Sequence, residues 1–168
     1  MSLISDNHFC NSKLNKPIVW LMTLLLMSCS SAPVPTPPAP PKPIILSVNL
    51  KGGKNLNPDL EGRASPLVVR IYQLENIATF NTSDFFALYE NDQSLLAKDI
   101  KYRDEFEIKP EQNQEKKFEL KEGGHYLAIF AAFRDLDHAQ WKVFFEVQPT
   151  TNEPYKVILD NSSLAIEK

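Results

Sequence analysis

The sequence predicts an all-β fold, a two-sheet β-sandwich with a short helical insertion, over residues 44–168. Two observations predict this fold. Seven short segments concentrate the apolar residues in alternating or continuous runs, and turn signals separate these segments, which is typical of a sandwich. Roughly 125 residues follow Ile44, which is enough for one sandwich core. No cysteine follows Cys29, so a disulfide framework for this domain is excluded.

The strands are assigned from the spacing of the apolar side chains. Leu46, Val48 and Leu50 lie at every second position, which predicts a half-buried strand that begins at Ile44. The six other predicted strands are residues 67–74, 100–108, 118–120, 126–133, 141–147 and 155–159. The fifth strand of the series is apolar on both faces, which indicates a central strand that is covered from both sides.

Residues 81–90 break the strand pattern and predict a helix. Four helix-capping residues precede Phe85, and Leu88 and Tyr89 follow it at the spacing of one helical face. This apolar face is expected to cover the outer side of the predicted central strand as packed core, not as a cofactor site. A second short helix is predicted over residues 94–97.

Residues 1–28 are predicted to be a lipoprotein signal peptide. Lys13 and Lys16 form a positively charged segment, and the 11 mostly apolar residues Pro17–Met27 follow, against the roughly 20 that a membrane-spanning helix needs. The residues Leu26-Met27-Ser28-Cys29 resemble the lipobox of bacterial lipoproteins. The first segment of the chain is therefore interpreted as an export signal.

Cys29 is expected to carry a lipid anchor. Cleavage before Cys29 removes Cys10, the other cysteine of the chain, and leaves an exported thiol without an intrachain disulfide partner. By the resemblance, a lipobox cysteine carries three acyl chains, and two lipid signals already hold a protein stably on a membrane. Ser30, and not aspartate, follows the cysteine, which by the same resemblance points to the outer membrane. The alternative is an ordinary cysteine after a simple signal peptide.

Residues 29–43 are predicted to be a lipidated cysteine followed by a proline-rich linker. Seven prolines lie between Pro33 and Pro43, a density that prevents helix and central strand and favours extended polyproline II. At about 3.1 Å per residue, the 14 residues after Cys29 reach roughly 43 Å. The predicted role of the linker is to hold the folded domain away from a membrane surface.

Composition and motifs argue against several functions. The formal net charge is −3, whereas nucleic-acid binding needs clustered Lys and Arg. The sequence has no phosphate-binding glycine loop, no G-x-S-x-G and no H-E-x-x-H motif, and lipidation leaves no free cysteine nucleophile. The segment Asp135–His138 has oxygen and nitrogen donors but is interpreted as a solvated turn. We expect no enzyme, no cofactor, no metal site and no small-molecule substrate.

One long loop is the candidate recognition site. Residues 51–66 hold three of the five glycines and join two predicted strands, and sixteen residues is long for such a connection. Long ordered loops on a rigid scaffold are where recognition usually occurs. The alternative is a flexible hairpin loop without a binding function.

This loop and the strand after it resemble the TssJ/SciN family of type VI secretion lipoproteins. The run G-R-A-S-P-L-V-V-R-I-Y-Q-L from Gly62 to Leu74 is the most specific part, although the family often has proline in place of Ala64. Phe80, the segment Asp84–Tyr89 and the strand end Ala131–Arg134 belong to the same pattern. The resemblance runs from the lipobox to the C-terminus.

The resemblance implies a fold, a location and partners. The family fold is a transthyretin-like β-sandwich with added helices. The family proteins are non-enzymatic outer-membrane lipoproteins that face the periplasm and bind the periplasmic C-terminal region of the inner-membrane protein TssM. Together with TssL, these proteins form the envelope-spanning membrane complex of the type VI secretion system.

In the family, the loop between the first two strands contributes to TssM binding. The expected contact residues are therefore Asn55, Leu56, Asn57, Asp59, Leu60, Glu61 and Arg63. The two leucines are expected to be apolar anchors of the interface, and Arg63 can form forked, charge-assisted hydrogen bonds. Deletion of residues 54–61 is expected to abolish binding with little change in melting temperature.

Two other functions stay open from the sequence. A periplasmic carrier would hold a small ligand or lipid in a sandwich cavity lined by residues such as Phe130, Trp141 and Phe144, although packed core explains these side chains more simply. An enzyme would need His125 or His138 in a pocket with a carboxylate of perturbed pKa.

Overall fold

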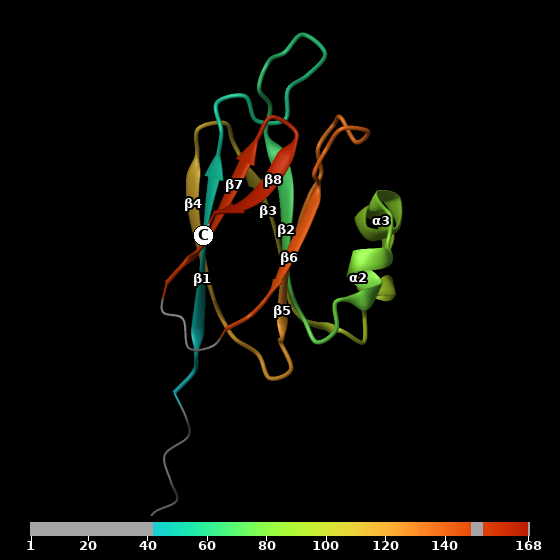
Figure 1. Cartoon of the computed structure of the whole chain (residues 1–168), viewed down its shortest axis with the longest axis vertical. Coiled ribbons are helices and arrows are strands. Elements are labelled where there is room, and N and C mark those ends of the chain that lie inside the picture. The colour runs from blue at the N-terminus through green and yellow to red at the C-terminus, as the bar shows by residue number, and fades with distance from the viewer. Residues whose placement is uncertain (1–41, 149–152, 168) are drawn as a thin grey trace, which may run out of the picture. The chain divides into compact units, whose positions relative to one another are not determined.

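Two four-stranded sheets pack face to face and form the sandwich. The computed structural model describes residues 42–148 and 153–167. The elements are, in chain order, β1 (Ile45–Gly52), β2 (Leu67–Leu74), α2 (Ala78–Thr82), α3 (Phe85–Leu95), β3 (Ile100–Ile108), β4 (Asn113–Glu119), β5 (Tyr126–Ala131), β6 (Lys142–Glu146), β7 (Tyr155–Asp160) and β8 (Ser163–Glu167). Sheet 1 has the strand order β4-β1-β7-β8 and sheet 2 the order β3-β2-β5-β6 (Figure 1). The predicted all-β sandwich with a helical insertion is confirmed.

The directions of the strands paired with β1 show which end of the sandwich each connection lies at. β1 runs antiparallel to β4 and parallel to β7, with Val48 opposite Tyr155. Both β1 and β7 therefore begin at one end of sheet 1, where the described chain also begins. The connection from β1 to β2 lies at the opposite end (Figure 1).

The inner core lies between the two sheets. Every second residue of β1, from Leu46 through Leu50, is buried there, and Leu127 and Ile129 of β5 oppose them. The period of two in the sequence is the reason, because successive side chains of a strand point to opposite faces. Full burial of each such side chain stabilises the fold by about 1.5–3 kcal/mol.

A second core lies on the outer side of sheet 2, under the two helices. Ala128 and Phe130 of β5 point to this side and pack with Phe80 of α2 and Leu88 of α3. The prediction that the helical segment covers the outer face of an all-apolar central strand is confirmed. Asp84 caps α3, since its Oδ1 accepts a hydrogen bond from Ala87 N at 2.9 Å.

The helical segment differs in detail from the prediction. The predicted second short helix is present in part, because α3 departs from helical geometry at Asn91 and its second piece includes Ser94 and ends at Leu95. The five-residue helix α2 has no counterpart in the prediction, since it lacks a side-chain N-cap and buries only Phe80. None of the helices within residues 42–148 and 153–167 has the length and apolar character that crossing a bilayer requires.

Residues 42–148 and 153–167 contain eight strands, whereas the apolar spacing predicts seven. β8 is five residues long and follows a two-residue turn at 161–162. Its alternating apolar pattern consists only of Leu164 and Ile166, which is too short to predict a strand. β4 begins at Asn113, five residues before the predicted start, because its inward position Lys116 is polar. The Lys116 ammonium pairs with Asp104 at 2.8 Å and lies 4.0 Å from the ring centre of Phe106.

Candidate partner-binding surface

The connection between β1 and β2, residues 53–66, extends beyond the end of the sandwich (Figure 1). It contains all seven contact residues expected from the sequence. The structure divides this connection, which we call the β1–β2 loop, into an exposed tip and a buried base. The two parts have different chemistry.

The tip, residues 59–63, is a closed turn organised by Asp59. Its Oδ1 accepts hydrogen bonds from Glu61 N (3.0 Å) and Arg63 N (2.9 Å), and its Oδ2 pairs with Arg63 Nε at 2.8 Å. The chain ends of the turn are also joined, by Asp59 N to Arg63 O at 2.9 Å. Gly62 has a φ of +77°, which favours glycine at this position. The hydrogen bonds from Arg63 and Glu61 outweigh desolvation and hold the pKa of Asp59 below its ordinary value.

The closed turn presents one apolar side chain to solvent. Leu60 is fully exposed at the end of the turn, between the acidic Asp59 and Glu61. Arg63 Nη2 also pairs with Glu61 Oε2 at 2.5 Å, so the charged side chains are arranged before any partner binds. A preorganised turn loses little conformational entropy on binding, which favours affinity.

The base of the loop is buried, which corrects the expectation for Leu56 and Asn57. Leu56 is fully buried and belongs to the inner core. Asn57 is nearly buried, with a left-handed φ of +46°, and its Nδ2 donates to Pro66 O at 2.9 Å. These two residues support the tip and are not accessible to a partner. Deletion of residues 54–61 would remove the core side chain of Leu56, so we expect a clear fall in melting temperature instead of a small change.

Asn57 joins the loop to two other connections at the same end of the molecule. Its Oδ1 accepts a hydrogen bond from Arg134 N at 2.9 Å, and its backbone N donates to Asn161 O at 2.8 Å. Arg134 lies between β5 and β6, and Asn161 lies in the β7–β8 turn. The sequence pattern does not assign these two residues to the site, because they are 77 and 104 positions away from Asn57 and only the fold unites them.

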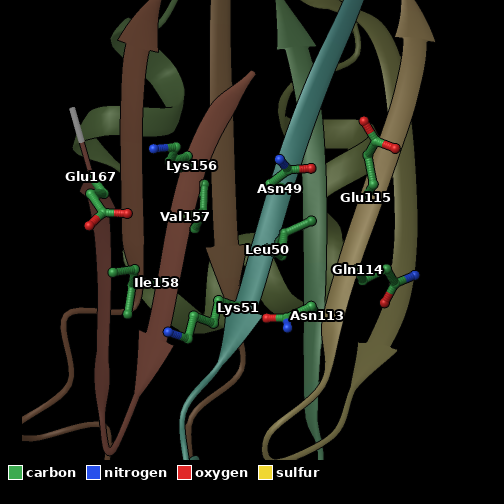
Figure 2. Close-up of a pocket in the computed structure, with 10 residues that line it drawn as sticks. All are labelled: Asn49, Leu50, Lys51, Asn113, Gln114, Glu115, Lys156, Val157, Ile158 and Glu167. Carbon is green, nitrogen blue, oxygen red and sulfur yellow. The ribbon is translucent and has the colours of Figure 1, made fainter. Parts of the chain in front are cut away.

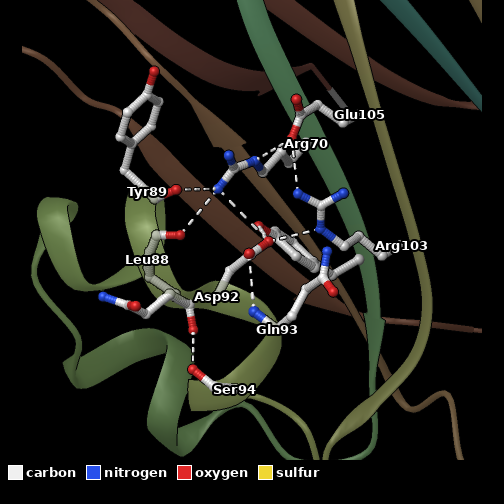
Figure 3. A network of polar contacts seen from close by, with 10 residues as sticks. Arg70, Leu88, Tyr89, Asp92, Gln93, Ser94, Arg103 and Glu105 are labelled. Atoms are coloured by element: carbon white, nitrogen blue, oxygen red, sulfur yellow. Dashed lines mark hydrogen bonds and ion pairs between the residues drawn. The ribbon is translucent and has the colours of Figure 1, made fainter.

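An ionic cluster, buried at Asp92 and Arg70 and open to solvent at Glu105, holds α3 against sheet 2 (Figure 3). Asp92 of α3 accepts hydrogen bonds from Arg103 Nε and Tyr72 Oη, both at 2.7 Å. Arg70 pairs through Nε with Glu105 Oε2 at 2.6 Å, and Arg103 Nη2 contacts the same oxygen at 2.7 Å. Burial, and the hydrogen bond to the negatively charged Asp92 carboxylate, raise the pKa of Tyr72, so its hydroxyl stays a donor.

The same cluster supports an irregular point in α3. Asn91 departs from helical geometry, with φ −130° and ψ 21°. Next to this point, Arg70 Nη1 donates to the carbonyl oxygens of Leu88 (3.0 Å) and Tyr89 (2.9 Å), while Gln93 N donates to Asp92 Oδ1 (2.9 Å). Charged side chains thereby satisfy backbone groups that a bent helix leaves without regular partners.

Acidification should destabilise the fold through this cluster. Burial raises the pKa of Asp92, but hydrogen bonds from Arg103 and Tyr72 outweigh it and leave the pKa below its ordinary value. Hydrogen bonds from Arg70 and Arg103 lower the pKa of Glu105. Carboxyl groups with a lowered pKa contribute stability above their unfolded values of about 3.9 and 4.3, and lose it as the pH falls through the folded values. Urea unfolding between about pH 3 and pH 7 measures this loss; an equal loss in an Asp92→Asn/Glu105→Gln variant would contradict it.

Two of the aromatic residues named for a carrier cavity, Phe130 and Trp141, pack against α3 instead. Phe130 is fully buried and packs against Phe85, with ring centres 5.1 Å apart, and Trp141 meets Phe85 at 5.5 Å. A hollow of about 410 Å³ lies on the outer face of sheet 1 and is lined mainly by polar side chains, such as Asn49, Lys51 and Glu115 (Figure 2). Phe130, Trp141 and Phe144 do not line this hollow.

The two histidines in the described part of the chain, His125 and His138, lie at the surface. His138 is exposed, and its hydrogen bond to Asp135, 2.9 Å from Nδ1 to Oδ1, raises its pKa. His125 lies in a shallow hollow with Glu75 and Lys101, where the Lys101 hydrogen bond lowers the pKa of Glu75. General acid–base catalysis near neutral pH would need that pKa to be raised. Within the described ranges, no group of three His, Cys, Asp or Glu side chains could hold a metal ion.

Comparison with known families finds a match over most of the chain. The family model described as T6SS-SciN, type VI secretion lipoprotein, VasD, EvfM, TssJ, VC_A0113, matches residues 45–162. This range includes the β1–β2 loop and both helices. A search of curated proteins finds no match.

Solved structures share the fold. The T6SS lipoprotein TssJ1 from Pseudomonas aeruginosa is 32% identical, with a TM-score of 0.71 over 75% of this chain and 96% of that chain. A chain of a structure described as a type VI membrane complex is 23% identical, with a TM-score of 0.67 over 76% of this chain and 100% of that chain. A chain of a structure described as the T6SS protein TssM C-terminal domain (869-1107) from EAEC is 22% identical, with a TM-score of 0.66 over 73% and 99%.

Proposed function

This chain belongs to the type VI secretion lipoprotein family, and we propose that it is an outer-membrane-anchored lipoprotein which faces the periplasm and binds a TssM-like inner-membrane protein. Binding would involve the periplasmic C-terminal region of that partner and would help to assemble a membrane complex that also contains a TssL-like protein. The role is structural and not catalytic. Chains of this fold in structures described as a type VI membrane complex and as the TssM C-terminal domain support the proposal.

One observation carries the proposal, the closed tip of the β1–β2 loop. The exposed Leu60 projects from a turn that Asp59 and Arg63 hold closed. An apolar side chain with preset charges around it has the features of an interface centre, since a few anchor residues carry most of the binding energy. We propose contacts through the tip residues Asp59, Leu60, Glu61 and Arg63 and the neighbouring Asn55, with Leu56 and Asn57 as internal supports.

The position of the loop agrees with an anchor at Cys29. The described chain begins next to β1, and the loop lies at the other end of that strand (Figure 1). Eight residues of β1 span roughly 26 Å at about 3.3 Å per residue. An anchor that is joined through residues 29–43 is therefore attached to the end of the sandwich opposite to the tip, which leaves the tip accessible to a partner.

Replacing Leu60 with aspartate should weaken binding to the partner by roughly 30-fold, the equivalent of about 2 kcal/mol for a central interface residue. The fold should be unaffected, because Leu60 is fully exposed and surface changes usually alter stability by about 0.5 kcal/mol or less. Calorimetric titration with the purified periplasmic region of the TssM-like protein gives the affinity, and thermal unfolding gives the stability.

A matched control is Phe86→Asp, which also places a carboxylate at an exposed apolar position but on α3. Its affinity should equal that of the wild type. Wild-type affinity of the Leu60→Asp variant would remove the tip from the binding mechanism. Equal weakening of both variants would indicate that added negative charge, and not the loss of Leu60, is the cause.

A further inference from the structure

The edges of the two sheets differ in how they are protected against pairing with other chains. Among the described residues, the edge strands are β3, β4, β6 and β8. β3 alternates charged residues through its centre, Lys101, Arg103 and Glu105, and β4 has the inward-pointing Lys116. Such charges are the usual protection of edge strands. The central residues of β6 are instead Val143, Phe144 and Phe145, and those of β8 are Leu164, Ala165 and Ile166.

The backbone of β6 presents hydrogen-bonding groups to this edge. Ala131 N donates to Trp141 O and Val147 N donates to His125 O, so the odd-numbered residues of β6 are the ones hydrogen-bonded to β5. The N–H and C=O groups of Phe144 and Glu146 therefore point away from β5. Within the described part of the chain, these groups have no hydrogen-bond partner.

β8 faces β6 and diverges from it. Just before β6, Gln140 forms a parallel bridge with Ser163 of β8, and Leu164 N donates to Gln140 O at 3.0 Å. Beyond this bridge a groove of about 690 Å³ opens between Phe144 of β6 and Ile166 of β8. This volume lies in the range of about 300–1,000 Å³ that is typical of binding sites.

The lining of the groove is apolar at the floor and acidic at the rim. Phe145 and Tyr155 form the floor with ring centres 4.4 Å apart, and Phe144 keeps 36% of its surface exposed. Three carboxylates, against one ammonium, lie among the lining side chains, which are Glu146, Glu153, Glu167 and Lys156. Within the described residues none of these four side chains forms an ion pair, so the rim has an uncompensated negative charge.

We propose that the β6 edge binds an extended peptide segment of a protein partner, with apolar and basic residues in alternation. The segment adds a strand to sheet 2, through hydrogen bonds to the backbone of Phe144 and Glu146. Its apolar side chains enter the groove and its lysine or arginine side chains meet the carboxylates at the rim, since alternate side chains of a strand point to opposite sides.

This site is distinct from the β1–β2 loop. Glu146 pairs with Tyr126 at the beginning of β5 and Tyr155 begins β7, which runs parallel to β1, whereas the loop follows the end of β1. The two surfaces therefore lie toward opposite ends of the sandwich. Failure of one proposal leaves the other unaffected.

The test uses the full chain in detergent and three fluorescent hexapeptides. One peptide alternates lysine with valine, the second alternates glutamate with valine, and the third has the lysine–valine sequence with N-methylated backbone. The lysine–valine peptide should bind at least tenfold more tightly than the other two. Hydrogen-exchange mass spectrometry should show slower exchange in residues 142–148 when it binds.

Variants of β6 test whether the peptide binds at the backbone of this edge strand. Phe144→Pro removes the outward N–H without removing a bond to β5, because proline is tolerated where the N–H faces away from the sheet. It should abolish peptide binding, whereas Phe144→Ala, which keeps the N–H, should weaken binding by less than tenfold. Glu146→Lys/Glu167→Lys should reverse the preference in favour of the glutamate–valine peptide, and this result does not depend on the folding of the proline variant.

Several outcomes would overturn the proposal. These are no binding of the lysine–valine peptide, equal binding of the N-methylated peptide, protection confined to β3 or β4, or an unchanged preference of the charge-reversed variant. Protection of residues 142–148 that depends on protein concentration without any peptide would assign the edge to a second copy of this chain.

Discussion

Replacing Asp92 with asparagine should lower the free energy of unfolding by about 3 kcal/mol, which is the lower end of the range for breaking a buried ion pair. Asp92 is nearly buried and accepts hydrogen bonds from both Arg103 and Tyr72. Asparagine keeps the shape but offers one acceptor oxygen and no charge. Two guanidinium groups, those of Arg70 and Arg103, would then share Glu105 as their remaining anionic partner in this cluster. Urea unfolding at neutral pH measures the difference.

Glu115→Gln is the matched control, since it removes the same charge from a surface ion pair. Glu115 and Lys117 lie 3.0 Å apart with both side chains about half exposed, so the expected loss is within about 1 kcal/mol. A loss for Asp92→Asn as small as that of the control would show that the cluster does not stabilise α3. The hydrogen exchange of residues 84–96 distinguishes local release of α3 from global destabilisation.

Elements with a regular apolar pattern are predictable from the sequence. β1 and β2 have apolar residues in a period of two or in a continuous run, and both lie within a residue or two of the predicted positions. The two-sided burial of β5 also follows, because Leu127 and Phe130 are apolar on opposite faces of one strand. For these elements, the residues that the core requires are also the residues that local propensity favours.

Elements that depend on distant partners are not predictable in this way. Lys116 occupies an inward position of β4 only because Asp104 and Phe106 of β3 provide a charge and a ring for its ammonium group. The short strand β8 is stabilised by its pairing with β7 and by its bridge to Gln140. A local window of sequence contains neither interaction.

The candidate site shows the same limit. Length and composition locate the β1–β2 loop, but they do not distinguish Leu56 from Leu60, since an apolar residue in a loop can enter the core or remain exposed for a partner. The structure places Leu56 in the core and leaves Leu60 at the tip. The distinction arises from Asn57, whose contacts with Arg134 and Asn161 fix the path of the chain between the two leucines.

The ionic cluster illustrates why a charged residue within an apolar strand can be structural. Arg70 lies in the middle of β2 and is nearly buried, although an arginine is seldom buried without a partner. Its partners are Glu105 on β3 and two carbonyl oxygens of α3, so the strand contributes a cation to the irregular point of the helix. The helical insertion therefore depends on polar groups as well as on its aromatic face.

Cys29→Ser should move the protein from the membrane fraction to the soluble periplasmic fraction. Cys29 lies outside the described residues, and the lipid anchor remains a proposal from the sequence. Each buried methylene of an acyl chain contributes about 0.8 kcal/mol to membrane binding, so loss of all chains leaves the sandwich without a stable anchor. Palmitate labelling followed by fractionation measures the change, and labelling should disappear in the variant.

The variant should bind the TssM-like region in vitro with wild-type affinity, because the β1–β2 loop belongs to the sandwich, and yet it should not support secretion. Cys10→Ser is the matched control, since it changes the other cysteine of the chain, which the predicted cleavage removes. This control should remain labelled and membrane-bound. If the Cys29→Ser variant keeps its label or its membrane association, the anchor lies elsewhere. If the variant is soluble but no longer binds the partner, the membrane attachment and the loop do not act as separate parts.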